Sequence, residues 1–327
     1  MLVFCGASGR DPIESIDPQF HGLLAAEQLE VLSLEDISAA EPGTIVLDGI
    51  LTLAHAPVTA ALVDSVDSSQ LKIISNYGSG VDHIDLAAMK ERGIPVANLR
   101  ALPELTEATA DCAFALLLAA ARRVVECDAY ARSAAFTSYD NLLLLGSRVS
   151  GTTLGIVGMG TIGLEVARRA AGFRMRILYH NRNRCGEELE GAVQATFCPT
   201  LPELLAESDY VVLMLSGNEL LMDAAACAAM KPGATLINMA RGGVVDNKAL
   251  AVALGSGHIG SAALDVTDPE PLPLDHPLRG QPRCTILPHR GSAARYARDA
   301  MCRKTFGHLM LGLRGDAKSI ASIVDWV

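Results

Sequence analysis

The sequence predicts an α/β protein that is built on parallel β-sheets and is long enough for two domains. Apolar strand-like segments alternate with helix-like segments, which is typical of right-handed βαβ units and parallel sheets. Between Thr153 and Arg184 this alternation carries a glycine-rich turn of the dinucleotide-binding type. A chain of 327 residues is longer than a domain with a single hydrophobic core usually is.

The glycine-rich unit is the most informative stretch of the chain. Residues 154–157 form a short apolar run, as expected for a strand that is covered on both faces. Gly158, Gly160 and Gly163 then give G-x-G-x-x-G, followed by a predicted helix at 164–171. In such a turn the first glycine permits the tight bend, the second admits a pyrophosphate and the third allows close helix packing. A second strand follows at 175–179, and this context predicts a nicotinamide dinucleotide site.

The end of that second strand indicates which dinucleotide is bound. A site that prefers NAD usually places an acid there to bind the ribose 2′-hydroxyl. This chain has Asn181 at that point, and Arg182 follows. Because a guanidinium pairs with a 2′-phosphate where a carboxylate would repel it, we expect NADP(H) to be preferred, with NAD(H) as the alternative. Simple solvation of Arg182 and Arg184 in a surface loop is the competing interpretation.

Composition excludes several classes of function. The net charge of −10 argues against nucleic-acid binding, which needs clustered basic residues. The longest continuous apolar stretch, 112–121, is well below the ~18 residues of a membrane span. The N-terminus lacks a basic region with a long apolar run, and the eight cysteines include no C-x-x-C pair. With 50% hydrophobic residues to fill a core, the chain is predicted to be soluble and cytoplasmic, with no metal site.

The remaining elements follow from apolar runs and breakers. Before the glycine-rich unit we expect strands at 1–7, 44–50, 71–75 and 94–99, and helices at 23–29, 57–66, 85–92 and 106–133. Thr106 is the expected N-cap of the helix at 106–133. The middle of this helix is apolar, which predicts that it is buried on several sides, in part at a subunit interface. Beyond Arg184 we expect helices at 201–207, 218–230, 246–254 and 293–313, and strands at 210–215, 234–239, 259–264 and 284–287.

A second glycine-rich turn, residues 76–82, directly follows the predicted strand at 71–75. Its closely spaced Gly78 and Gly80 can present backbone N–H groups to an anion. An ordinary glycine-rich turn explains the same pattern equally well.

Three ionisable side chains follow predicted strands, where the ligand crevice of an open α/β sheet lies. Arg241 follows the strand at 234–239, Asp265 ends the strand at 259–264 with Glu270 nearby, and His289 follows the strand at 284–287. Arginine can bind a carboxylate bidentately and polarise a carbonyl, while histidine can protonate an alkoxide. A nearby glutamate favours imidazolium and raises the histidine pKa. Each residue alone has a structural explanation, but together they predict hydride transfer to a 2-oxo acid.

These motifs resemble those of the D-isomer-specific 2-hydroxyacid dehydrogenase family, and most of all its glyoxylate/hydroxypyruvate reductase branch. The matching pieces are NYGSGVDHID (76–85), LTEATAD (105–111), LGIVGMGTIG (154–163), MKPGATLINMARGGVVD (230–246), LDVTDPEP (264–271) and LPHRGSA (287–293). The resemblance implies that Arg241 binds substrate, that Glu270 pairs with His289, and that His289 is the acid/base. It also implies that the backbone of Ser79 and Gly80 helps to hold the substrate carboxylate.

The same resemblance implies two Rossmann-like, doubly wound domains with an active-site cleft between them. The substrate domain would comprise residues 1–103 plus 292–327, and the dinucleotide-binding domain residues 104–291, through which the family usually forms a homodimer. The cofactor site would comprise Thr106, Gly158, Gly160, Thr161, Ile162, Gly163, Asn181, Arg182, Ser216, Met239, Ala240, Asp265 and Gly291.

Some positions depart from the family pattern. The N-x-P-G hinge reads NLRALP at 98–103, the usual P-L-T is Met-Leu-Ser at 214–216, and Ser79 replaces a commonly apolar residue. Arg290 follows His289 where an aliphatic residue is usual. We hypothesise that Arg290 favours a substrate with a second anionic group.

The expected function is therefore NADPH-dependent reduction of a small 2-oxo acid, of the glyoxylate, hydroxypyruvate or 2-ketogluconate class, to the D-2-hydroxy acid. Glu270 argues against the related formate dehydrogenases, which have glutamine at that position. A phosphite dehydrogenase-like enzyme keeps the same arginine, glutamate and histidine and stays open. A corepressor-like protein that senses NAD(H) is the non-enzyme alternative, although the missing acid at Asn181 counts against it.

Overall fold

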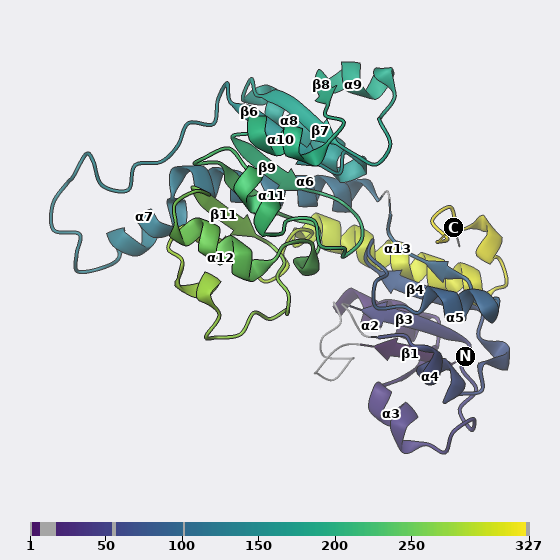
Figure 1. The fold of residues 1–327 in the computed structure, drawn as a ribbon. Coiled ribbons are helices and arrows are strands. Elements are labelled where there is room, and N and C mark those ends of the chain that lie inside the picture. The colour runs from purple at the N-terminus through teal and green to yellow at the C-terminus, as the bar shows by residue number, and fades with distance from the viewer. Residues whose placement is uncertain (1, 7–17, 54–56, 101, 325–327) are drawn as a thin grey trace. The chain divides into compact units, whose positions relative to one another are not determined.

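The computed structural model describes residues 2–6, 18–53, 57–100 and 102–324, and their contacts divide the chain into two compact units (Figure 1). Unit 1 comprises Met1–Leu105 and Ala294–Val327, and unit 2 comprises Thr106–Ala293. Each unit carries a parallel sheet with helices, which confirms the predicted α/β fold class. Met1 and Ala7 of the predicted first strand lie outside the described residues.

Unit 1 has a five-stranded parallel sheet in the order β2-β1-β3-β4-β5, the flavodoxin-like arrangement of doubly wound folds. Its strands are β1 (Leu2–Gly6), β2 (Glu30–Leu32), β3 (Gly49–Leu53), β4 (Ile73–Tyr77) and β5 (Val96–Ala97). Its helices are α2 (Pro18–Ala26), α3 (Leu34–Ala39), α4 (Ala60–Asp64), α5 (Leu86–Glu91) and α13 (Arg295–Leu313), with short 3₁₀ turns η1 (Ser68–Gln70) and η4 (Ala317–Ser319).

Helices cover both faces of the unit 1 sheet, and consecutive strand residues point to opposite faces. In β4, Ile73 packs in one apolar cluster with α2 and α13, and Ile74 packs in another with α4 and α5. A Cβ atom on Gly312 of α13 would lie 2.3 Å from the Cβ of Ile73. Glycine is therefore required for α13 to lie this close to the sheet.

Unit 2 has a seven-stranded parallel sheet in the order β12-β11-β10-β9-β6-β7-β8, the Rossmann order with one added strand. Its strands are β6 (Thr153–Val157), β7 (Arg176–His180), β8 (Ala195–Phe197), β9 (Tyr210–Leu213), β10 (Thr235–Asn238), β11 (Ser261–Leu264) and β12 (Cys284–Ile286). Its helices are α6 (Pro103–Arg122, which begins in unit 1), α7 (Val124–Ala131), α8 (Thr161–Gly172), α9 (Glu187–Val193), α10 (Leu201–Glu207), α11 (Ala224–Ala229) and α12 (Asn247–Gly255), with 3₁₀ turns η2 (Gly242–Val244) and η3 (Pro277–Gly280).

The unit 2 sheet is likewise buried on both faces. Ile156 of β6 packs with α6 and α8, and its neighbour Val157 packs with α10, α11 and α12. The apolar middle of α6 is buried in this core: Phe114, Leu117 and Ala121 are all buried there. The strand–turn–helix–strand unit predicted from the glycine motif is confirmed as β6, α8 and β7.

The prediction of one long helix at 106–133 is wrong in two respects. It begins at Pro103, where proline suits a first helical turn, so Thr106 lies inside the helix and is buried rather than being its N-cap. It is also interrupted at Arg123, whose left-handed φ of 54° separates α6 from α7. The guanidinium of Arg123 forms an ion pair with Glu126, with Nη2 and Oε2 2.5 Å apart, which stabilises this turn.

The helix predicted at 218–230 is shorter than expected. The backbone N–H groups of Leu221 and Met222 both donate to the carbonyl of Val244 in η2. These two residues therefore pair with the backbone of η2 and are not helical. The helix α11 starts only after Asp223, whose carboxylate caps Ala226 N at 2.8 Å. Among the described residues, no helix combines the length and apolar character needed to cross a membrane.

Candidate active site

The glycine turn between β6 and α8 has the geometry of a phosphate-binding turn. Gly158 has a φ of 97°, and a Cβ atom there would lie 2.7 Å from the backbone nitrogen of Leu215. A Cβ atom on Gly163 would lie 2.5 Å from the carbonyl oxygen of Gly158. At Gly160, in contrast, a Cβ atom would meet no protein atom within 4 Å. The open space at the start of α8 therefore fits the pyrophosphate of a dinucleotide.

Asn181, directly after β7, supports this turn. Its side-chain Oδ1 accepts a hydrogen bond from Met159 N at 2.7 Å, and its Nδ2 donates to Met159 O at 3.3 Å. Arg182 is exposed, and no described residue forms a hydrogen bond or ion pair with its side chain. Asn181 thus holds the turn, and the exposed Arg182 is the next residue in the chain.

Arg241 lies in the turn after β10. Asn238, the last residue of β10, shapes this turn: its Nδ2 donates to Arg241 O at 2.9 Å, and its Oδ1 accepts from Ala240 N at 3.0 Å. A Cβ atom on Gly242 would lie only 1.9 Å from the carbonyl oxygen of Thr267, so the turn packs directly against the segment after β11. The half-buried Arg241 side chain donates from Nη1 to Ala240 O at 2.8 Å.

Asp265, which ends β11, is 2% exposed and holds the histidine loop. Its Oδ1 accepts from Arg290 N at 2.5 Å and its Oδ2 from Gly291 N at 2.8 Å. Its backbone carbonyl accepts from His289 N at 2.9 Å. One buried acid therefore fixes three consecutive residues after β12.

His289 and Glu270 form a pair across two loops. The Nδ1 atom of His289 lies 2.9 Å from Oε1 of Glu270, and the two side chains are 35% and 36% exposed. Two hydrogen bonds hold the segment before Glu270: Asn247 Nδ2 donates to Asp268 O at 2.8 Å, and Thr267 Oγ1 donates to Pro269 O at 3.0 Å. Hydrogen bonds thus hold the backbone next to each member of the pair, while both side chains remain accessible to water.

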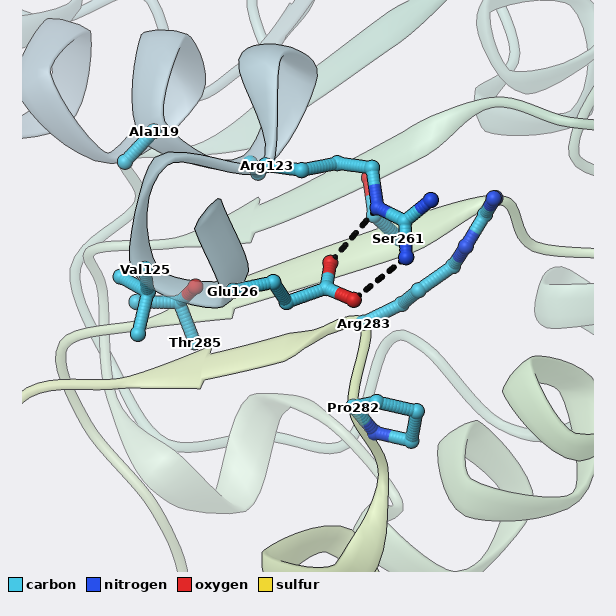
Figure 2. Close-up of a pocket in the computed structure, with 9 residues that line it drawn as sticks. Ala119, Arg123, Val125, Glu126, Ser261, Pro282, Arg283 and Thr285 are labelled. Carbon is cyan, nitrogen blue, oxygen red and sulfur yellow. Dashed lines mark hydrogen bonds and ion pairs between the residues drawn. The ribbon is translucent and has the colours of Figure 1, made fainter. Parts of the chain in front are cut away.

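All of these side chains lie beyond the carboxyl ends of parallel strands, the edge at which ligands bind in open α/β sheets. The cavity in Figure 2 is at the opposite edge: Ser261 begins β11, and Pro282 and Arg283 precede β12. Its volume of about 10 Å³ holds no more than a water molecule. The Arg123–Glu126 ion pair crosses it, and it contains no predicted site residue.

Comparison with known proteins agrees with this arrangement. The family profile of the D-isomer specific 2-hydroxyacid dehydrogenase NAD binding domain matches residues 114–291. The chain belongs to the D-isomer specific 2-hydroxyacid dehydrogenase family. It is 41% identical over 273 residues to a glyoxylate reductase of Korarchaeum cryptofilum, covering 82% of this chain and 80% of that one. The predicted resemblance to the reductase branch is confirmed, and the chain is an oxidoreductase of this family.

Two solved structures extend the comparison to the whole fold of this dehydrogenase. A protein of Thermus thermophilus is 38% identical with a TM-score of 0.86, and the match covers 99% of this chain and 100% of that one. An NADPH-dependent glyoxylate/hydroxypyruvate reductase of Sinorhizobium meliloti, in complex with citrate, is 29% identical with a TM-score of 0.84, covering 99% and 96%. The family's NAD binding domain makes a nicotinamide dinucleotide the cofactor class.

The predicted substrate-carboxylate loop of this dehydrogenase lies in unit 1, after β4. Asn76 Nδ2 donates to Gly80 O at 2.7 Å, and Asn98 Nδ2 donates to Ser79 O at 2.9 Å. The two asparagines hold the carbonyl groups, and the backbone N–H groups of Ser79 and Gly80 donate to no described residue. The role of these N–H groups in binding an anion stays a prediction.

The other predicted cofactor residues are in unit 2, and all follow its strands or lie on α6 and α8. They are buried Thr106, Met239, Ala240 and Gly291, half-buried Ile162, and exposed Thr161 and Ser216. Sequence reasoning missed the supporting side chains Asn98, Asn238, Asn247 and Thr267. An asparagine at the end of an apolar run, as at Asn98 and Asn238, is the signal that could have found two of them.

Proposed function

We propose that this chain catalyses the NADPH-dependent reduction of a small 2-oxo acid, of the glyoxylate, hydroxypyruvate or 2-ketogluconate class, to the D-2-hydroxy acid. The observation that carries the proposal is the contact of 2.9 Å between His289 Nδ1 and Glu270 Oε1 at the strand edge that also bears the glycine turn. The names of relatives as glyoxylate reductases support the substrate class.

Each site residue has a defined role in this reaction. Arg241 pairs with the substrate carboxylate and polarises the carbonyl, because its guanidinium offers two parallel N–H donors. A reduced nicotinamide, when bound, would supply the hydride for the carbonyl carbon. His289 gives a proton to the carbonyl oxygen as the alkoxide forms, and we assign this transfer to Nε2 because Glu270 accepts from Nδ1.

Glu270 orients the imidazole through its contact with Nδ1. About a third of each side chain is exposed, so solvent can return the proton to His289 after turnover. Ser79 and Gly80 remain our prediction for the second set of donors to the substrate carboxylate, through the N–H groups described above.

Arg182 carries the proposed preference for NADPH. Arg182 follows Asn181, and its guanidinium has no partner among the described residues, which suits a 2′-phosphate. Asn181 places no negative charge at this point. The name of the Sinorhizobium meliloti structure as an NADPH-dependent enzyme supports this proposal.

Steady-state oxidation of NADPH and of NADH tests the function. We would use glyoxylate, hydroxypyruvate, 2-ketogluconate, pyruvate, oxaloacetate and phenylpyruvate in turn. We expect kcat/KM with NADPH to exceed that with NADH by about a hundredfold or more, since a lost charge-assisted pair costs about 3 kcal/mol. Preference for NADH would overturn the cofactor assignment. Absence of turnover with every acid would overturn the reductase proposal and direct the assay to phosphite.

A further inference from the structure

Glu190 of α9 is one of two carboxylates that are buried among the described residues; the other is Asp265. Asp265 holds the histidine loop, whereas Glu190 has no task in the proposed reaction. Its residue is 8% exposed, so its charge must be balanced by neighbours. The residues that bind the Glu190 carboxylate indicate its role.

Glu190 binds the arginine that lies two residues beyond Arg182. Arg184 Nε donates to Oε1 of Glu190 at 2.8 Å and Nη2 donates to Oε2 at 2.7 Å, a bidentate pair. Tyr179 Oη donates a further hydrogen bond to Oε1. These contacts lower the pKa of Glu190 to about 2, so the carboxylate stays ionised. The Arg184 guanidinium also lies over the Phe197 ring, 5.9 Å from its centroid.

The same network ties both ends of the loop between β7 and α9, residues 181–186. At its far end, Cys185 N donates to Tyr179 Oη at 2.9 Å, and Cys185 Sγ accepts from Asn181 Nδ2 at 3.3 Å. At its near end, Asn181 is bound to Met159 in the glycine turn. Arg182 therefore projects from a loop that is anchored on each side.

We propose that Glu190 is a positioning residue for cofactor selection: it engages Arg184 as a structural cation and so fixes the loop from which Arg182 alone meets the 2′-phosphate. The inference rests on the proposed use of NADPH. The two arginines look equivalent in the sequence, but the bidentate pair with Glu190 occupies the Nε–Nη2 edge of Arg184. A phosphate that displaced Glu190 would leave a buried carboxylate without its cation, which is unfavourable.

The test is the discrimination ratio, the Kd of AMP divided by the Kd of adenosine 2′,5′-bisphosphate, measured by calorimetry on the full chain. We expect Arg182→Gln to remove most of the discrimination, tenfold or more on the scale of one lost charge-assisted pair. We expect Glu190→Gln to lower it by a smaller factor, roughly threefold to tenfold, because the loop loses its anchor while Arg182 remains. AMP binding, which makes no use of Arg182, should be unchanged in both.

Glu190→Gln separates the two explanations. If Arg184 were a direct phosphate ligand, releasing it from Glu190 would raise the discrimination ratio or leave it unchanged, and that result would overturn the inference. If the pair acts as one unit, Arg184→Gln, Glu190→Gln and the double variant should lower the ratio by the same factor. The double variant also guards against misfolding, since it leaves no unpaired buried charge.

Arg176→Gln is the matched control, because Arg176 lies on β7 and forms an exposed ion pair with Glu207 at 2.8 Å. It should leave the discrimination ratio unchanged, and a decrease equal to that of Glu190→Gln would overturn the inference. Equal binding of the two nucleotides by the unmodified chain would instead refute the proposed use of NADPH, and this inference with it. Discrimination by the unmodified chain that survives Glu190→Gln would refute the inference alone.

Discussion

At the scale of single residues, the site is organised by side chains that bind backbone groups rather than substrate. Asp265 fixes the histidine loop through Arg290 N and Gly291 N, and Asn238 fixes the arginine turn. The backbone groups they bind lie in loops, where no sheet ladder supplies a partner. The turns that carry Arg241 and His289 thus depend on side chains that bind backbone groups.

The first residue-scale prediction concerns Glu270→Gln. The substitution keeps the shape of the side chain and removes the charge that faces His289 Nδ1 at 2.9 Å. We expect kcat for reduction to fall about tenfold to a hundredfold, part of the usual contribution of general acid catalysis, with little change in cofactor binding. Single-turnover kinetics would measure this. Glu203→Gln, an exposed acid on α10, is the control, and equal kcat values for all three proteins would exclude a role for Glu270.

The second residue-scale prediction concerns Arg290, whose side chain is exposed beside His289 and whose backbone N–H is held by Asp265. Since the substitution leaves the backbone bond intact, Arg290→Ile should raise KM for a dianionic 2-oxo acid such as oxaloacetate about fivefold to tenfold, and change KM for glyoxylate little. Arg290→Lys should retain most of the preference. The hypothesis fails if Arg290→Ile leaves KM for both acids unchanged.

At the scale of elements, the sequence predicted segments with strong apolar periodicity and missed those defined by tertiary contacts. The helix at 201–207 agrees with α10 residue for residue, because it lies between Thr200 and a buried strand. In contrast α3, β2, α9 and β8 were not predicted. Of these, α9 begins Glu-Glu-Leu-Glu and looks like a solvated run, yet its Glu190 is buried by the pairing with Arg184.

In the candidate site, too, the residues at strand ends were predictable and the residues that support them through tertiary contacts were not. Arg241, Asp265 and His289 were predictable because each follows an apolar strand, and strand ends of a parallel sheet share one edge. The hydrogen bonds from Asn181 to Met159 and from Asn247 to Asp268 were not predicted, and they link residues 22 and 21 positions apart. Long-range contacts of this kind depend on side-chain packing, which periodicity does not encode.

The element-scale prediction concerns α13 and the segment that follows it. His308 is 2% exposed, and its Nε2 lies 3.3 Å from Ser322 Oγ. Burial, and secondarily the charge of Lys304, lowers the pKa of His308 from 6.5 to about 4. The folded state therefore favours neutral imidazole, so this stability is fully present above pH 6.5 and is lost as pH falls from 6.5 towards 4.

Chemical denaturation at a series of pH values measures this effect. Between pH 7 and 4.5 the unmodified chain should lose roughly 2 kcal/mol more unfolding free energy than His308→Gln, whose side chain does not titrate, after allowance for solvent screening. The carboxylates that both proteins share cancel in the difference. Parallel stability curves for the two proteins would show that His308 does not contribute to the acid sensitivity.

At the scale of the whole molecule, unit 2 carries an apolar surface that its own fold does not cover. We define the arm as residues 124–145, comprising α7 and the loop after it, which Figure 1 shows extending from the rest of unit 2. Its large exposed hydrophobic side chains are Val124, Val125, Phe136, Tyr139, Leu142, Leu143 and Leu145. Such a concentration of exposed apolar groups is typical of an interaction site. We therefore expect the arm to be the interface of the predicted homodimer.

The last prediction tests the arm directly. Light scattering after gel filtration should give twice the chain mass of 34.4 kDa for the unmodified protein. Tyr139 is 85% exposed and Leu142 73% exposed, so the double variant Tyr139→Glu with Leu142→Glu should not disturb the folded unit. If two arms pack together, the variant would bury four unpaired charges and raise the dimer Kd by about a hundredfold or more, giving monomers at micromolar concentration.

Leu274→Glu is the matched control, since Leu274 is 87% exposed in the same unit but lies outside the arm. It should leave the dimer intact. A dimer that survives the arm variant would assign the interface elsewhere, and a monomeric unmodified chain would refute the homodimer itself. Activity per chain should persist in the monomeric variant, because Arg241, Glu270 and His289 belong to the same chain and none lies in the arm.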